Sequence, residues 1–260
     1  MTDTRLWDRA AAMPAVRDGH RLPEIATLTV DRPTVAELFE FMRDAELRFA
    51  TLRMRIVEHA ATTRGDVRTT TDLMLRHPGD ARVTTSRESV AVSGDYEVWI
   101  SDGEIVRTYS GVHRLGTQRP VRIRPRGLDD ADFPGSAQVY EPLTALPAET
   151  LVETFVHPAG FCQNVLATGH SIVTGSDVVN DREAILLECD HPRTTEIAGD
   201  RPDHHLSVAV DRETGVILRI VETLGSAVTR QADAVELSPD APLPPAAFEF
   251  VFPTGTTMLY

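Results

Sequence analysis

Two short stretches of the sequence carry side chains that bind transition metals. Cys189 and His191 flank Asp190 in one stretch, and the pair His204 and His205 opens the other. Thiolate and imidazole are common zinc ligands, and two antiparallel strands joined by a loop would set His191 opposite His204. The same pairing would set Asp190 opposite His205. The spacing matches no compact zinc motif, so polar residues beside a surface loop are the simpler interpretation. We therefore predict no metal site and keep a metal-dependent enzyme built on these side chains as the weaker hypothesis.

The other cysteine, Cys162, would be a nucleophile only with a base beside it. A reactive thiol needs a cation or a helix N-terminus to lower its pKa, together with a histidine partner. His157 and His170 are near Cys162 in sequence, which does not place them near it in space. We expect a small buried hydrophobic side chain at this position, with a disulfide bond to Cys189 as the alternative.

The sequence contains none of the short motifs of common catalytic or nucleotide-binding sites. It has no G-x-S-x-G, P-loop, G-x-G-x-x-G, H-E-x-x-H or C-x-x-C. Several arginines could meet a phosphate or a lipid head group, but arginines on the water-facing side of strands are the simpler interpretation. These arginines are Arg53, Arg55, Arg122, Arg124 and Arg126. We predict a non-catalytic protein without a cofactor.

The composition excludes some partners and locations. The chain has 260 residues, a formal net charge of −13 and no lysine. Because the chain has no surplus of cations to neutralise phosphates, a nucleic-acid partner is not expected. Charged residues interrupt the N-terminal stretch before a signal peptide or lipobox can form, and no apolar run reaches the roughly 18 residues of a membrane span. We expect no transmembrane segment and a cytoplasmic location, unless the start is truncated.

The clearest predicted element is a β-hairpin over residues 205–224. Every second residue from Leu206 to Val210 is apolar, which is typical of a strand with one buried face. Residues 211–215 have turn chemistry, with an aspartate at the start and a glycine at the end, and the alternation resumes at Val216. A two-stranded hairpin is not stable alone, so this one must belong to a larger sheet.

Helix and strand signals alternate along the rest of the chain. Thr34 and Glu37 form a predicted capping box, which begins a helix that runs to about Glu46 with one apolar stripe. Short helices are predicted near residues 147–156 and 160–166. Further strands are predicted within residues 51–59, 69–80, 81–87, 96–100, 104–109, 168–174, 182–189 and 227–237.

Two segments stand apart from these strands. Residues 125–147 are rich in proline and acidic side chains, too long for a passive connection, and are a predicted lid or domain junction. Near the C-terminus, a last strand is predicted to place Phe248, Phe250 and Phe252 on one face.

Taken in order, these elements resemble the LolA/LolB superfamily. The resemblance covers residues 34–253 and rests on the motifs VNDREAILLEC, LSVAVDRETGVILRIVET and LPPAAFEFVFPTG. That superfamily includes the periplasmic lipoprotein carrier LolA, the amino-terminal domains of the RseB/MucB sigma-factor regulators, and mycobacterial lipid-binding lipoproteins. The resemblance implies an α+β, mainly antiparallel, incomplete half-barrel whose concave face is covered by helices, with an apolar cavity for acyl chains. The exported members carry a signal or lipobox, which this sequence does not show.

We therefore predict an N-terminal arm over residues 1–30 and a single domain over residues 31–260. The domain is expected to hold a lipid or another hydrophobic small molecule in its concave face. The alternative is an RseB-like regulatory domain whose concave face or edge strand engages a protein partner. Alternation codes equally for a filled core and for a cavity lining, so both remain open. The residues expected to line the cavity are Leu52, Met54, Ile56, Leu73, Leu75, Val98, Ile100, Leu206, Val208 and Val210.

Overall fold

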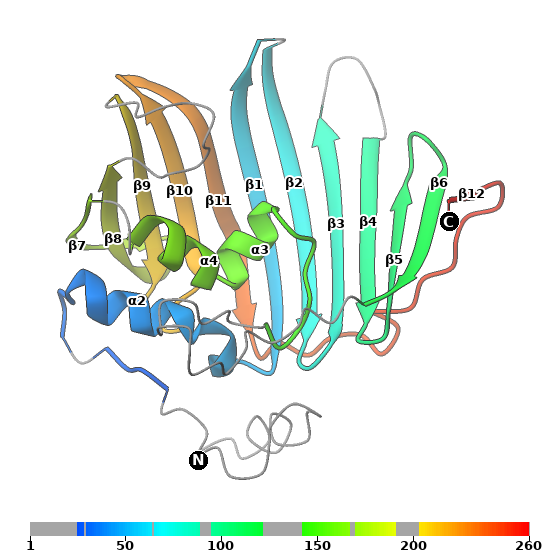
Figure 1. Cartoon of the computed structure of the whole chain (residues 1–260), viewed down its shortest axis with the longest axis horizontal. Coiled ribbons are helices and arrows are strands. Elements are labelled where there is room, and N and C mark those ends of the chain that lie inside the picture. Colours follow the sequence, from blue (N-terminus) through cyan, green and yellow to red (C-terminus); the bar gives the residue numbers. More distant parts are fainter. Residues whose placement is uncertain are drawn as a thin grey trace, which may run out of the picture.

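The computed structural model describes residues 25–28, 30–63, 65–88, 95–121, 142–166, 170–190 and 203–259. Within them, one sheet contains twelve strands in the order β12-β6-β5-β4-β3-β2-β1-β11-β10-β9-β8-β7 (Figure 1). The strands are β1 Thr51–Thr62, β2 Gly65–Arg76, β3 Asp80–Glu88, β4 Asp95–Asp102, β5 Ile105–Ser110, β6 Leu115–Pro120, β7 His170–Val179, β8 Arg182–Asp190, β9 His204–Asp211, β10 Ile217–Leu224, β11 Ala227–Pro239 and β12 Thr257–Leu259.

The sheet consists of two antiparallel meanders that lie side by side. Strands β1 to β6 follow one another in chain order, β7 to β11 do the same, and β11 pairs with β1. The short β12 is the exception, because it pairs with β6 in parallel. Strands β7 and β12 lie at opposite ends of the sheet, which is therefore open (Figure 1). The prediction of a mainly antiparallel, unclosed sheet is confirmed.

The predicted hairpin over residues 205–224 forms β9 and β10. Val208 pairs with Ile220, and Val210 pairs with Ile217. The turn closes through two backbone hydrogen bonds, from Asp211 N to Val216 O and from Gly215 N to Asp211 O. Gly215 has a φ of +81°, which a residue with a side chain rarely adopts. The sequence pattern therefore sets both the strands and the turn.

The half of the sheet from β7 to β11 curls. Asp233 is the last residue of β11 with a partner on β10, and the carbonyl of the next residue, Ala234, accepts a hydrogen bond of 2.9 Å from the side-chain amide of Asn180. Asn180 lies in the turn between β7 and β8, which β9 and β10 separate from β11 in the sheet order. A contact across two intervening strands requires the sheet to bend around its own concave side.

The helices lie on one face of this curled half, in front of β7 to β11 and of β1 (Figure 1). We call this surface the inner face and the opposite surface the outer face. The helical pieces are α2 Val35–Arg43, the 3-10 helix η1 Ala45–Arg48, α3 Leu151–Val156, α4 Ala159–Phe161 and the π-helical turn η3 Cys162–Leu166. No helix in the described part of the chain is long and apolar enough to cross a membrane.

Helix α2 begins as predicted and ends earlier than predicted. The Thr34 hydroxyl accepts from Glu37 N, and the Glu37 carboxylate accepts from Thr34 N, which completes the capping box. The α-helix ends at Arg43, and Asp44 caps both its end and the start of η1, so the stretch up to Glu46 is not one helix. The predicted short helices near 147–156 and 160–166 correspond to α3 and to α4 with η3.

The C-terminal segment, residues 240–256, lies on the outer face before the chain enters β12. The Phe250 ring contacts that of Tyr109 on β5, and a side chain at Gly116 on β6 would meet the ring of Phe252. The predicted last strand is therefore wrong, because residues 248–252 form no strand of the sheet. The alternation itself is right, since Phe248 is buried while Val251 is 88% exposed.

Several predictions fall outside the described residues. They concern most of the N-terminal arm, the insertion up to residue 141, His191, and the arginines Arg122, Arg124 and Arg126. The end of the insertion, from Pro142 onward, is described.

Candidate functional site

The inner face carries a continuous apolar surface from β8 to β2. Cross-strand pairing brings apolar side chains from distant parts of the sequence into one layer. The aligned neighbours are Leu187, Val208 and Ile220 on one side of β11, and Leu52 with Leu75 and Met54 with Leu73 on the other. This surface is the candidate site.

Side chains of the helical cover fill the space above this surface. Leu38 and Met42 from α2, Phe49 after η1, and Phe155 from α3 are all fully buried. Eight of the predicted lining residues lie in the same cluster and are at most 5% exposed: Leu52, Met54, Ile56, Leu73, Leu75, Leu206, Val208 and Val210. These residues form a packed core, and their contact with a ligand stays a prediction.

The other two predicted lining residues lie on the outer face. Leu73 pairs with Val83, and Val83 pairs with Trp99, so Trp99 shares the inner face with Leu73. Its strand neighbours Val98 and Ile100 point the opposite way. They belong to a separate cluster with Tyr109, against which Phe250 and Phe252 pack. Val98 and Ile100 therefore do not share a surface with the other eight.

Toward β6 the inner face changes from apolar to amphiphilic. Trp99 is half-buried and pairs with Thr108, which pairs in turn with Thr117. The hydroxyls of Thr108 and Thr117 lie 2.6 Å apart, and those of Thr71 and Thr85 lie 3.4 Å apart. None of the described helices lies over β3 to β6 (Figure 1). The Trp99 indole and the threonine hydroxyls thus extend the inner face from the apolar part under the helices toward β6.

Two pockets lie elsewhere on the described surface. One of about 380 Å³ lies beside the β9–β10 turn and is lined by charged residues: Asp181, Arg182, Glu183, Asp211, Arg212 and Glu213. The other, of about 280 Å³, lies between the outer face and residues 242–244 of the C-terminal segment and includes Arg53 and Arg55. The Arg55 guanidinium is already paired with Asp72 and Glu236. Neither pocket has the enclosed apolar lining expected for an acyl chain.

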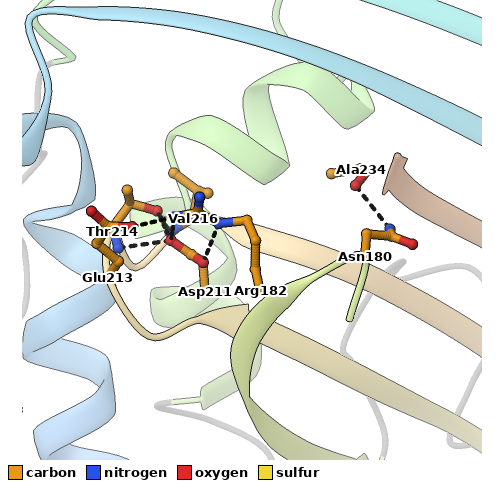
Figure 2. Close-up of polar contacts among 7 residues, drawn as sticks. All are labelled: Asn180, Arg182, Asp211, Glu213, Thr214, Val216 and Ala234. Atoms are coloured by element: carbon orange, nitrogen blue, oxygen red, sulfur yellow. Dashed lines mark hydrogen bonds and ion pairs between the residues drawn. The ribbon is translucent and has the colours of Figure 1, made fainter. Parts of the chain in front are cut away.

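A buried carboxylate organises the β9–β10 turn. Figure 2 shows Asp211, which is 1% exposed, accepting hydrogen bonds from Arg182 and from the backbone and hydroxyl of Thr214. The carboxylates of Asp211 and Glu213 raise the pKa of the Arg182 guanidinium, because both favour its charged form. Several donors thus satisfy the buried charge of Asp211. We therefore interpret this group of residues as structural support for the turn.

Three arginines connect the sheet to the segments around α2. Arg48 donates to the carbonyls of Phe41 and Thr214 and to that of Ala26, which joins α2, the β9–β10 turn and the N-terminal segment. Arg212 donates to the carbonyls of residues 30 and 31. Arg32 donates two hydrogen bonds to a carbonyl of β7, that of residue 173. The cover is therefore attached to the curled half through arginine–carbonyl bonds.

A buried acid–base pair lies where the described end of the insertion meets the cover. Glu46 on η1 and His157 at the end of α3 have a carboxylate oxygen and Nδ1 3.5 Å apart, and their side chains are 15% and 8% exposed. The same carboxyl oxygen accepts a hydrogen bond of 2.9 Å from Leu143 N. Burial raises the pKa of Glu46 to about 8 and lowers the pKa of His157 to about 4, because desolvation penalises both charged forms.

The metal candidates do not converge. His205 Nδ1 lies 2.7 Å from the Asp190 carboxylate, on the outer face. Cys189 pairs with Leu206 on the inner face and is 1% exposed, and His204 is two residues along the same strand face. The described residues contain no group of three or more His, Cys, Asp or Glu side chains that could hold a metal ion.

Both cysteines are buried free thiols, so the alternative of a Cys162–Cys189 disulfide is wrong. Burial raises the pKa of Cys162 to about 12, which keeps the thiol protonated and unreactive. The expectation of a small buried hydrophobic side chain at this position agrees with its complete burial.

Sequence reasoning missed Glu46, His157 and Trp99. The sequence presents Glu46 only as the end of an amphipathic helix, and His157 only as a possible partner for Cys162. The break at Asp44, which turns Glu46 inward, leaves no signal in the apolar periodicity. Trp99 could have been recognised, because an apolar run over Val98, Trp99 and Ile100 means that both faces of the strand are covered.

Comparison with known proteins gives similarity in structure alone. No family model and no curated protein matches the sequence. The MucA/MucB complex of Pseudomonas aeruginosa contains a chain with 14% identity and a TM-score of 0.47, over 84% of this chain and 61% of that one. A LolA superfamily protein from Nitrosomonas europaea has 10% identity and a TM-score of 0.34, over 84% and 98% of the two chains. The chain is similar to LolA superfamily structures.

The Mycobacterium tuberculosis lipoprotein LppX is a further similar structure, with 10% identity and a TM-score of 0.40, over 81% of this chain and 96% of LppX. The chain spans about three fifths of the MucB chains that it resembles, with 62% of one covered. The likeness to all of these proteins concerns the fold.

Proposed function

We propose that this protein is a non-catalytic binding protein that holds an amphiphilic ligand, such as a lipid, against the inner face of its sheet. The change of chemistry along that face carries the proposal. Apolar side chains from β8 to β2 lie under the helices, and the half-buried Trp99 continues the face with the hydroxyls of Thr85, Thr108 and Thr117. An apolar chain would bind along the first part and a polar head group along the second.

Binding an acyl chain requires the helical cover to move, because side chains such as Phe155 fill the apolar part. The cover consists of short pieces: α3 has six residues and α4 has three. Helices of this length are not stable without tertiary contacts, so they can rearrange when those contacts are exchanged for a ligand. The exchange would keep the apolar area buried, at about 25 cal/mol per Å².

The test is photolabelling with a fatty acid that carries a diazirine in its chain, followed by peptide mapping. The two apolar clusters form an internal matched pair, because both are buried and only one faces the cover. We expect label in peptides that contain residues 52–56, 151–156 and 206–210, and none at residues 248–252, which belong to the outer side and include neither Trp99 nor Thr108. An excess of unlabelled fatty acid should remove the label. Equal labelling of the two clusters, or no labelling of the first, would contradict the proposal.

A protein-interaction domain is the second candidate function, and the edge strand β7 favours it. This strand of ten residues ends the sheet, and its side chains Ile172 and Val178 are 62% and 63% exposed. Such an edge can accept a strand from a partner. A pull-down in which Ile172→Arg with Val178→Arg removes a stable partner, while fatty-acid labelling is absent, would favour this function. The cytoplasmic location stays a prediction from the sequence.

A further inference from the structure

We propose that Glu46 and His157 form a pH-sensitive latch, which holds the segment Pro142–Leu146 and the end of α3 against η1 in mildly acidic solution and loosens them in alkaline solution. The latch does not depend on the proposed ligand. It concerns how the cover is attached and is testable on the protein alone.

The geometry places one carboxyl group at the junction of three elements. Glu46 projects from η1, accepts from Leu143 N at 2.9 Å, and lies 3.5 Å from His157 Nδ1 at the C-cap of α3. The hydroxyl of the neighbouring Thr144 accepts a hydrogen bond of 2.8 Å from Gly79 N and lies 2.8 Å from His77 Nδ1. These two contacts attach the same segment to the β2–β3 turn. The segment is therefore held at two adjacent residues, Leu143 and Thr144. The contact at Leu143 includes a carboxyl group, whereas the contacts at Thr144 are made by its hydroxyl.

Other charged groups on the elements around the pair are engaged elsewhere. On α2 and η1, Arg43 pairs with Glu40 and Asp44, and Arg48 donates to backbone carbonyls. On α3, the Glu153 carboxylate accepts from Glu149 N. His77 at the end of β2 faces Thr144. The charge of the latch is thus determined by Glu46 and His157.

The two groups have opposite pH dependences. For Glu46, the ordinary pKa of 4.5 rises to about 8 in the closed state, so closing is favoured at low pH and this contribution is lost as the pH rises from 4.5 to about 8. For His157, the ordinary pKa of 6.5 falls to about 4, so closing is favoured above pH 6.5 and this contribution is lost as the pH falls from 6.5 to about 4. Between 4.5 and 6.5 the two slopes cancel. Above 6.5 only the Glu46 slope remains, which gives the loosening in the proposal.

Loosening would uncover apolar surface. Leu146 of the segment is 8% exposed, and Phe155 and Val156 of α3 are fully buried. These side chains belong to the cluster that fills the inner face. If the proposed function holds, the latch would regulate access to that face.

The experiment is hydrogen exchange of the full chain from pH 5 to 9, with rates normalised to those of an unstructured peptide. For wild type we expect the protection of the Leu143 amide to be constant up to pH 6.5 and then to fall by about tenfold per pH unit up to pH 8. We expect the Leu143 amide to be less protected than the amides of residues 206–210 at every pH, because it exchanges through local opening. Global opening also exposes Glu46, so both sets of amides should show the same slope. The Glu46→Gln variant keeps the acceptor for Leu143 N and cannot ionise, so its protection should be flat above pH 6.5.

A second variant keeps the test informative if Glu46→Gln does not fold. His157→Gln removes the opposing slope, so protection should already fall with pH between pH 5 and 6.5, where that of wild type is constant. The proposal is overturned if wild type and Glu46→Gln fall alike, if the Leu143 amide is as strongly protected as residues 206–210 at every pH, or if His157→Gln leaves the slope between pH 5 and 6.5 unchanged.

Discussion

The two faces of the sheet each bury an apolar cluster, and the clusters are covered in different ways. On the inner face, helices and connecting segments from many parts of the chain cover residues such as Leu52 and Val208. On the outer face, one continuous C-terminal segment covers Val98, Ile100 and Tyr109 with its aromatic rings. The inner core therefore holds the curled half together, while the outer cluster attaches one segment to strands β4 to β6. Loss of an inner contact should weaken the whole fold, and loss of an outer contact should mainly release the segment.

The largest expected difference comes from removing one aromatic ring on each face. Phe155 is fully buried in the inner cluster, so Phe155→Ala should reduce the free energy of unfolding by about 3 to 5 kcal/mol. Phe250 is half-buried in the outer cluster, so Phe250→Ala should cost about 1 to 2 kcal/mol. Urea denaturation measures both. Equal losses would mean that the outer cluster is as important to the fold as the core.

A comparison of two ion pairs tests the importance of the curled half. Arg182→Ala would leave the carboxylate of Asp211, which is 1% exposed, without its cation, and should cost about 3 kcal/mol. Arg55→Ala is the matched control, because Arg55 pairs with Asp72 and Glu236 on the exposed outer side of β1 and should cost at most about 1 kcal/mol. Thermal unfolding of the two variants gives the comparison. A small effect of Arg182→Ala would show that the Thr214 donors alone satisfy Asp211.

The smallest expected effect concerns the attachment of the C-terminal segment. A Cβ atom at Gly116 would lie 2.7 Å from the Phe252 ring, so Gly116→Ala should displace the segment and cost about 1 to 2 kcal/mol. Gly175→Ala is the control, because a Cβ atom there meets nothing within 4 Å. Limited proteolysis should show faster cleavage near Phe252 in Gly116→Ala alone. Unchanged cleavage would mean that the segment is held mainly by β12.

Much of the fold could be predicted from local patterns. The alternation of residues 205–224 and the Asp211–Gly215 turn predict a hairpin, and the structure contains it. The capping box at Thr34 predicts the start of α2, and the structure has both of its hydrogen bonds. These predictions succeed because the interactions connect residues close together in the chain.

The predictions that failed depend on the relation between distant strands. Val98 and Ile100 alternate as Leu73 and Leu75 do, yet they face the other way, because the β3–β4 register sets Trp99 opposite Val83. A change of register by one residue exchanges the faces of a strand, and alternation contains no information on which face is chosen. The predicted last strand failed for a similar reason, since its aromatic residues pack on a sheet face without joining a ladder.

The sequence by itself determined most of the strands, the β9–β10 turn and the start of α2, because each depends on the conformational preferences of neighbouring residues. The tertiary structure decided which apolar side chains share the inner face, which lie under the C-terminal segment, and that Glu46 meets His157. The physical reason is that burial and pairing of side chains far apart in the chain are determined by strand order, register and curl, and these arise only when the whole sheet assembles.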